Sequence, residues 1–200
     1  MSVIGLTGGP ATGKSTFSKL LLRELPVAMF DCDRCVHDML ASDESVRHEI
    51  EAAFGPGALD ETGKPDRNRL RDIVFADDTR RGELEAILHP RVRSAWTAAA
   101  SAARASGGGL LVDMPLLFET GAAGEFDRII VVAATEKTQL QRLTTNRRLA
   151  PALAARIIRA QMELGAKTRQ ADHVIWNDST VSNLDGQTRL LASWLRRRFA

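Results

Sequence analysis

The sequence has little cysteine, no tyrosine and no long apolar segment. Two cysteines and three tryptophans occur among its 200 residues. No stretch reaches the roughly 18 uninterrupted apolar residues of a membrane-spanning helix, so we expect no contact with a membrane. The basic residues are scattered, the aromatic residues form no stacking platform, and the net charge is only +2. The sequence therefore does not predict a nucleic-acid partner.

The two cysteines, Cys32 and Cys35, form a C-x-x-C pair. A zinc site would need a second pair or histidines at finger spacing, and the four histidines do not provide that spacing. We interpret the pair as small reduced thiols and expect a cytosolic protein.

Short apolar runs alternate with helical stretches along the chain. Strands are predicted at Val3 to Leu6, Val27 to Phe30, Leu110 to Val112, Arg128 to Ala133 and His173 to Trp176. Helical periodicity is predicted from Lys14, from Asp33 to Ala105 with a loop near Phe54 to Pro65, from Gln139 to Ala171, and from Val181 to Phe199. Gly107 to Gly109 are expected to end the alanine-rich helix before them. This order predicts an α/β fold: a doubly wound core with a five-stranded parallel sheet and a helical insertion. The glycine loop at residues 8–15 makes this core P-loop NTPase-like, and the arginine-rich helical stretch near Pro151 predicts a helical lid.

The most specific motif is residues 8–15, GGPATGKS, which match G-x-x-x-x-G-K-[ST] between a strand and a helix. Such a loop turns its amides inward, and the helix after it adds the positive end of its dipole, which suits a triphosphate. We expect Lys14 to contact the β- and γ-phosphates of ATP, and Ser15 to bind Mg²⁺. The expected nucleotide contacts are Gly8, Gly9, Pro10, Ala11, Thr12, Gly13, Lys14, Ser15 and Thr16. The alternative is an ordinary glycine-rich turn that opens a helix.

Three aspartates follow predicted strands. Asp31 and Asp33 come after the second strand, where carboxylates lie near a phosphate loop and can bind an acceptor. We predict that Asp33 accepts the proton of the acceptor hydroxyl. The alternative is that Asp33 caps a helix while Asp31 only ends the strand. Asp113 has the placement of a Walker-B residue and is a candidate magnesium ligand, or equally a turn residue at a strand end.

Arginines gather in the helical stretch that is interrupted near Pro151. Arg142 and Arg147 are predicted to form part of a mobile lid, where guanidinium groups neutralise charge on the transferred phosphoryl group. For Arg156 and Arg159 we prefer a solvated basic helix face.

The residues also carry a family resemblance. Leu6 to Thr16 is similar to the signature of dephospho-coenzyme A kinases, and Asp31-Cys-Asp33 with His37 resembles the family's Asp-x-Asp segment. Later landmarks agree in order and spacing over nearly the whole chain: Gly63, Arg67, Leu70, Phe75, Leu88-His89-Pro90, Pro115 to Glu119, Arg142, Arg147, Gln161, Lys167, Ala171-Asp172, Ile175 and Asn177.

The resemblance implies an ATP- and Mg²⁺-dependent kinase that phosphorylates the ribose 3'-hydroxyl of dephospho-coenzyme A, the last step of coenzyme A biosynthesis. It implies a nucleotide-binding core at 1–31, 107–141 and 170–200, a helical coenzyme A-binding region at 32–106, and a lid at 142–169. It places Asp33 as the base and Asn177 near adenine. The implied acceptor-binding residues are Asp31, Asp33, His37, His89, Pro115, Leu116 and Glu119. We expect a monomer or a weak homo-oligomer.

The chain departs from the family pattern at three places. Pro10-Ala11-Thr12 stands where Ile-Gly-Ser is usual, which removes a glycine and one backbone donor. Arg148 replaces a small polar residue, and Ser179 replaces a glycine. These changes concern the shape of the phosphate loop, the charge of the lid and the adenine side of the site.

Two other functions remain open at this point. A P-loop kinase for a nucleoside monophosphate or shikimate would share the loop, magnesium and lid, but Asp33 and His89-Pro90 argue against it. A non-catalytic nucleotide-binding regulator would need no acceptor carboxylate.

Overall fold

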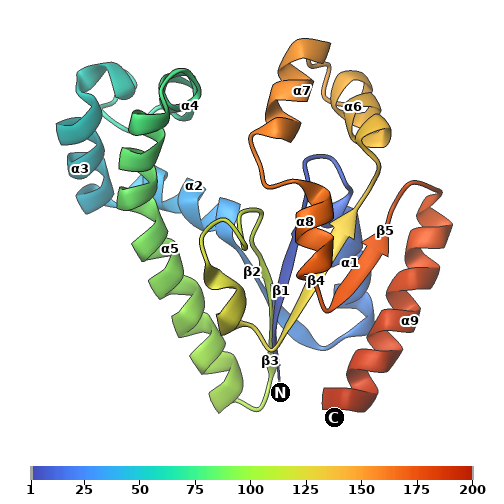
Figure 1. Cartoon of the computed structure of the whole chain (residues 1–200). Helices are drawn as coiled ribbons and strands as arrows, with labels where there is room; N and C mark the ends of the chain where they lie inside the picture. The colour runs from blue at the N-terminus through green and yellow to red at the C-terminus, as the bar shows by residue number, and fades with distance from the viewer. Residues whose placement is uncertain (1, 200) are drawn as a thin grey trace. The chain divides into compact units, whose positions relative to one another are not determined.

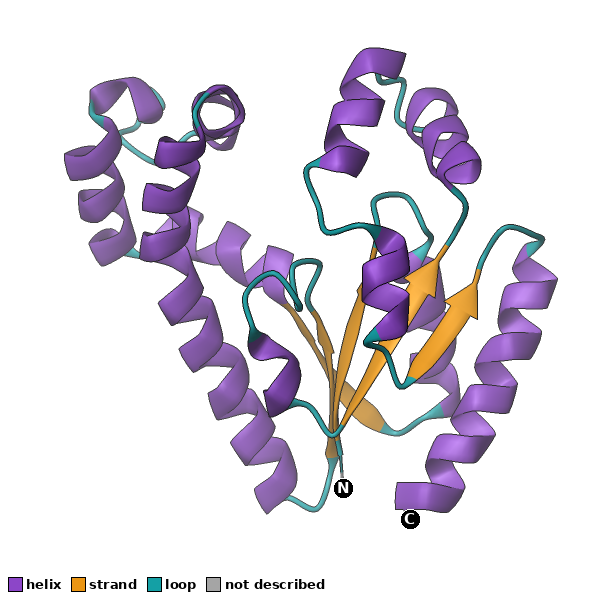
Figure 2. Cartoon of the chain, viewed as in Figure 1, coloured by secondary structure: helices purple, strands orange, loops and turns teal. Residues whose placement is uncertain are grey.

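The computed structural model describes residues 2–199. The elements, in chain order, are β1 (Val3–Gly8), α1 (Lys14–Glu24), β2 (Val27–Asp31), α2 (Cys32–Ser42), α3 (Glu44–Phe54), η1 (Pro56–Ala58), α4 (Arg67–Ala76), α5 (Asp78–Ala105), β3 (Gly109–Asp113), η2 (Ala122–Glu125), β4 (Arg128–Ala133), α6 (Glu136–Thr145), α7 (Pro151–Arg159), α8 (Leu164–Arg169), β5 (His173–Trp176) and α9 (Val181–Phe199). Figure 1 shows these elements along the chain, and Figure 2 separates strands from helices. The chain divides into two compact units, Met1–Phe30 with Ala100–Ala200 and Asp31–Ala99, which are described separately below.

The first unit is built on a five-stranded parallel sheet in the order β2-β3-β1-β4-β5. The predicted α/β core and its five strands are thus confirmed. Because β1 is central, with β3 on one side and β4 on the other, the loop after β1 lies between the carboxyl ends of two neighbours. That is where ligands bind in open parallel sheets.

The three inner strands β1, β3 and β4 are buried on both faces, as expected for a parallel sheet, whereas the edge strands β2 and β5 are partly exposed. Ile4 and Leu6 point to the face covered by α1 and α9, and they pack in one apolar cluster with Phe17 of α1 and Leu191 of α9. The opposite face is closed at Gly5, where a Cβ atom would lie 2.6 Å from Leu117. Alternating residues of β1 therefore face two different layers.

The boundaries of β3 correct one expectation. Gly109 was predicted to help end the preceding helix, but α5 ends at Ala105 and Gly109 is the first residue of β3. A Cβ atom at this position would lie 2.8 Å from Val27 of β2, so the missing side chain lets β3 approach the edge strand β2. Gly107, with φ of +69°, makes the turn between helix and strand.

The second unit contains α2, α3, η1, α4 and most of α5. Its core is a separate apolar cluster formed by Leu40, Val46, Ile50, Ala58, Leu59, Leu70 and Leu88. The predicted loop near 54–65 is present and carries η1 and a short bridge between Leu59 and Pro65. Pro90 does not interrupt α5, although its ring removes one helical donor.

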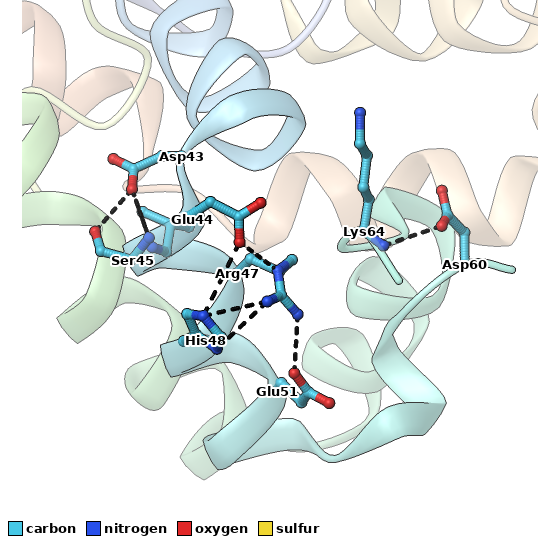
Figure 3. A network of polar contacts seen from close by, with 9 residues as sticks. Asp43, Glu44, Ser45, Arg47, His48, Glu51, Asp60 and Lys64 are labelled. Carbon is cyan, nitrogen blue, oxygen red and sulfur yellow. Dashed lines mark hydrogen bonds and ion pairs between the residues drawn. The ribbon is translucent and has the colours of Figure 1, made fainter. Parts of the chain in front are cut away.

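A polar network covers the start of α3 in this unit (Figure 3). Asp43 accepts hydrogen bonds from the amides of Ser45 and Val46 at 2.9 and 3.2 Å. The Ser45 hydroxyl bond and then these amides lower the pKa of Asp43. Arg47 pairs with Glu44 at 2.7 Å. Such exposed contacts stabilise a helix modestly, and the network is explained as the capping of α3.

Candidate active site

The loop between β1 and α1 forms a tight turn whose shape depends on its glycines. A Cβ atom at Gly8 would lie 2.3 Å from the carbonyl oxygen of Val132. Gly13 is the N-cap of α1, with φ of +94°. The side-chain nitrogen Nδ2 of Asn177 occupies the space that a Cβ atom of residue 13 would need. The amides of the first helical turn have no intrahelical carbonyl to bind, so those of Lys14 and Ser15 are available to an anion.

Ala11 adopts a left-handed conformation with φ of +55°. A residue with a Cβ atom is strained in the left-handed region, whereas glycine adopts this conformation freely. Next to it, the Thr12 hydroxyl donates to the carbonyl of Gly9 at 3.0 Å and closes the turn. The loop thus keeps its curl despite the Pro10-Ala11-Thr12 departure.

Lys14 and Asp113 lie side by side at the carboxyl end of the sheet. The Lys14 ammonium donates to Asp113 Oδ1, and both side chains are largely buried, with 15% and 7% exposed. Asp113 therefore acts in this structure as the partner of the loop lysine.

The candidate magnesium ligands are Ser15 and Asp113. Ser15 is exposed as the second residue of α1, and Asp113 contributes a carboxylate nearby on β3. Within residues 2–199, no group of three or more His, Cys, Asp or Glu side chains could hold a metal. The oxygen atoms of Ser15 and Asp113 fit Mg²⁺, because this ion is usually held by one or two protein ligands together with substrate phosphates.

Arg142 holds the phosphate loop from outside. From α6 its Nη1 donates to the carbonyls of Ala11 and Thr12 at 3.2 and 3.3 Å, and its Nη2 donates to the carbonyl of Asn177 at 2.8 Å. The Asn177 side chain is buried and donates to the Thr12 carbonyl at 2.8 Å. Arg147 lies exposed in the connection after α6. The predicted lid arginine Arg142 and the adenine-side residue Asn177 thus meet at the loop itself.

Sequence reasoning missed Gln139, which lies beneath the loop. Its Nε2 donates to the carbonyl of Ala134 at 3.0 Å, whereas its buried Oε1 has no hydrogen-bond partner within residues 2–199. A Cβ atom at Gly9 would lie 2.7 Å from this oxygen, so a larger residue at position 9 would displace the Gln139 side chain. No motif marks Gln139, because its contacts come only from the fold.

The segment after β3 is held at both ends. The carbonyl of Pro115 accepts from the Thr7 hydroxyl at 3.0 Å and from the Lys167 ammonium at 2.9 Å. Glu119 pairs with Lys167 at 2.9 Å, and the half-buried Leu116 lies between these two ends. Lys167 appeared in the sequence only as a landmark, since nothing local distinguishes it from a surface lysine.

The acidic pair after β2 belongs to the second unit. Asp31 caps α2 by accepting a hydrogen bond from the amide of Arg34 at 2.9 Å. The capping that we considered for Asp33 is therefore made by Asp31, because α2 begins at Cys32, so that Asp33 lies within its first turn. Asp33 lies exposed in the first turn of α2.

Two histidines of the second unit were predicted to bind the acceptor. His37, exposed on α2, contacts Arg67 of α4 through Nδ1 at 3.1 Å. His89 is half-buried on α5 beside Pro90.

A glycine loop with a paired lysine, placed at the end of the central strand of a parallel sheet, defines a P-loop kinase. Residues 2–183 match the family model described as "Dephospho-CoA kinase". The chain belongs to the dephospho-CoA kinase family, and it is an ATP-dependent kinase, a transferase.

Individual relatives agree with this assignment. A protein named "Dephospho-CoA kinase" from Symbiobacterium thermophilum is 40% identical over 97% of this chain and 80% of its own length. One of the same name from Geobacillus kaustophilus is 40% identical over 88% of both chains. The crystal structure of TT1252 from Thermus thermophilus has a TM-score of 0.79 and 29% identity, covering 98% of this chain and 96% of that one.

More distant structures show the fold alone. A shikimate kinase from Bacteroides thetaiotaomicron has a TM-score of 0.54 with 15% identity, covering 97% of this chain and 98% of that one. The described part of the chain also contains no helix both long and apolar enough to cross a membrane.

Proposed function

We propose that this protein transfers the γ-phosphoryl group of ATP to the ribose 3'-hydroxyl of dephospho-coenzyme A and so completes coenzyme A. The observation that carries the proposal is the family match over residues 2–183, which includes both the phosphate loop and the acidic segment after β2. Kinase relatives with nearly full-length similarity support ATP as the phosphoryl donor.

The nucleotide side of the reaction is assigned to the loop. The amides at the start of α1 and the Lys14 ammonium bind the triphosphate, and Lys14 moves its hydrogen bond from Asp113 to phosphate oxygens as charge develops there. Arg142 and Asn177 keep the loop carbonyls turned outward, which leaves the amides pointing to the anion. Arg147 adds positive charge from the lid segment.

Mg²⁺ would be held by Ser15 with help from Asp113, and it would neutralise charge on the transferred phosphoryl group. No further protein ligand is required, because the triphosphate supplies the remaining oxygens.

The acceptor side is assigned to the second unit and to the segment after β3. Asp33 takes the proton of the acceptor hydroxyl, and Asp31 keeps the first turn of α2 in place. His37, His89, Pro115, Leu116 and Glu119 are proposed to bind dephospho-coenzyme A. The protein is proposed to act in the cytosol as a monomer or weak homo-oligomer, with a core, an acceptor-binding helical region at 32–106 and a lid at 142–169.

An acceptor screen tests this function. ADP release is measured with MgATP and, in separate reactions, dephospho-coenzyme A, nucleoside monophosphates and shikimate, and the products are weighed by mass spectrometry. We expect rapid ADP release only with dephospho-coenzyme A, and a product heavier by one phosphate. Equal or faster turnover of another acceptor would refute the assignment, and nucleotide binding without turnover would indicate a regulator.

A further inference from the structure

Lys167 on α8 is a charged side chain with no exposed surface. Burial of an ammonium group costs several kcal/mol unless hydrogen bonds and a counter-charge compensate it. Here the compensation comes from the segment after β3: the Pro115 carbonyl and Glu119 Oε1 each lie 2.9 Å from Lys167 Nζ. A buried lysine thus ties α8 to the two ends of one five-residue segment.

The same segment is fixed by neighbours of the phosphate loop. The Pro115 carbonyl also accepts from the hydroxyl of Thr7, the residue just before the loop. Between the two ends, Leu117 is fully buried. The segment therefore has little freedom as long as Lys167 holds both of its ends.

Only one of the two carboxylate oxygens of Glu119 contacts Met162 and Lys167. Its Oε1 accepts a hydrogen bond from the Met162 amide and forms an ion pair with the Lys167 ammonium, each at 2.9 Å, whereas its Oε2 makes neither of these contacts. The side chain is 24% exposed, so this oxygen is within reach of a solute. The amide hydrogen bond and the ion pair at the same oxygen restrain the carboxylate and hence the direction of the other oxygen.

We propose that Lys167 is a positioning residue, which orients Glu119 so that its Oε2 accepts a hydrogen bond from a hydroxyl or amino group of the acceptor nucleoside. This rests on the proposed function and gives the Pro115–Glu119 segment a defined chemical role. Lys167 itself contacts no substrate; it acts through Glu119 and the Pro115 carbonyl.

The decisive variant is Glu119→Gln, with Lys167→Met as its companion. Glutamine keeps an oxygen for Lys167 and Met162 but replaces Oε2 by a donor NH₂ group, which cannot accept a hydrogen bond. Methionine has a similar length to lysine but carries no charge. Control variants are Glu136→Gln and Lys19→Met, two exposed residues of the same unit.

Steady-state kinetics is measured with each substrate varied in turn. We expect both variants to raise the KM for dephospho-coenzyme A about tenfold or more, as loss of a hydrogen bond to a charged group does, with the KM for ATP within about twofold of wild type. The KM of the double variant for dephospho-coenzyme A is expected to be no higher than that of the more affected single variant, since Lys167 acts through Glu119.

Three results would overturn the proposal. The first is a KM for dephospho-coenzyme A that is the same in Glu119→Gln and Glu136→Gln, and the second is a rise in the KM for ATP as large as the rise in the KM for the acceptor. The third is an acceptor KM of the double variant that rises by the product of the two single effects. If Lys167→Met does not fold, Glu119→Gln alone decides. If wild-type protein does not turn over dephospho-coenzyme A, the proposed function fails and this inference fails with it. If wild type is active and the variants match their controls, only the inference fails.

Discussion

At the scale of single residues, the phosphate loop contains one strained position. Ala11 has φ of +55°, a conformation in which an L-residue with a side chain loses roughly 1–2 kcal/mol relative to the right-handed region. Glycine avoids this cost but gains freedom in the unfolded chain, which offsets part of the benefit. The strain arises because Ala11 carries a Cβ atom in a left-handed conformation that glycine adopts freely.

We predict that Ala11→Gly raises the free energy of unfolding by roughly 0.5–1 kcal/mol, measured by urea denaturation. The matched control is Ala102→Gly, at an exposed position inside α5, which should lower it by roughly 0.5–1 kcal/mol. A loss of stability in Ala11→Gly similar to that of the control would show that position 11 is unstrained.

Residue-scale roles were only partly predictable from the sequence. The motif identified Lys14 and its loop, because the spacing of glycines and lysine reflects local geometry. It did not reveal that Arg142 binds loop carbonyls or that Lys167 is buried, since those contacts join residues more than 50 positions apart. The N-cap of α2 is Asp31 and not Asp33, because hydrophobic periodicity does not define the first residue of a helix.

At the scale of elements, β5 and α9 share a histidine that is better accommodated when neutral. His173 at the start of β5 packs edge-on against Trp194 of α9, with ring centroids 4.6 Å apart. Its Nε2 is buried without a hydrogen-bond partner within residues 2–199. Burial lowers the pKa of His173 below its usual value; the nearby Asp172 opposes this shift and Arg128 adds to it.

The direction of the pH effect follows from this lowered pKa. Above the unfolded-state value of about 6.5, both states hold a neutral imidazole and the contact contributes fully to stability. As the pH falls below 6.5 toward the lower folded-state pKa, the unfolded chain binds the proton first, and stability is lost by up to about 1.4 kcal/mol per pH unit.

We predict that wild-type protein loses stability more steeply between pH 7 and pH 5.5 than His173→Phe does, measured by urea denaturation at each pH. Phenylalanine keeps the aromatic contact with Trp194 but cannot be protonated. Identical pH profiles for the two proteins would show that His173 does not titrate differently on unfolding.

The elements themselves were largely predictable. All five strands lie within about two residues of their predicted positions, because each is a short apolar run between helical segments. Within residues 33–105 only the loop near 54–65 was predicted; the boundaries between α2 and α3 and between α4 and α5 were not resolved, since the capping aspartates Asp43 and Asp77 stand inside continuous helical periodicity. Gly109 was assigned to a helix end because the need for close approach to Val27 is not visible in the sequence.

At the scale of the whole molecule, the chain consists of two compact units, each with an apolar cluster of its own. The core carries the phosphate loop, Asp113 and the Pro115–Glu119 segment, whereas the helical unit carries the proposed base on α2. The family match over residues 2–183 includes residues of both units.

The central claim is that Asp33 receives the proton of the acceptor hydroxyl while the loop binds ATP. The most direct measurement compares turnover of dephospho-coenzyme A by wild type, by Asp33→Asn and by the control Asp38→Asn, an exposed aspartate on the same helix, with ATP affinity measured for each. We predict that Asp33→Asn loses roughly 10²–10⁴-fold in kcat with ATP affinity within about twofold, and that Asp38→Asn keeps wild-type turnover. Wild-type turnover in Asp33→Asn would contradict the account.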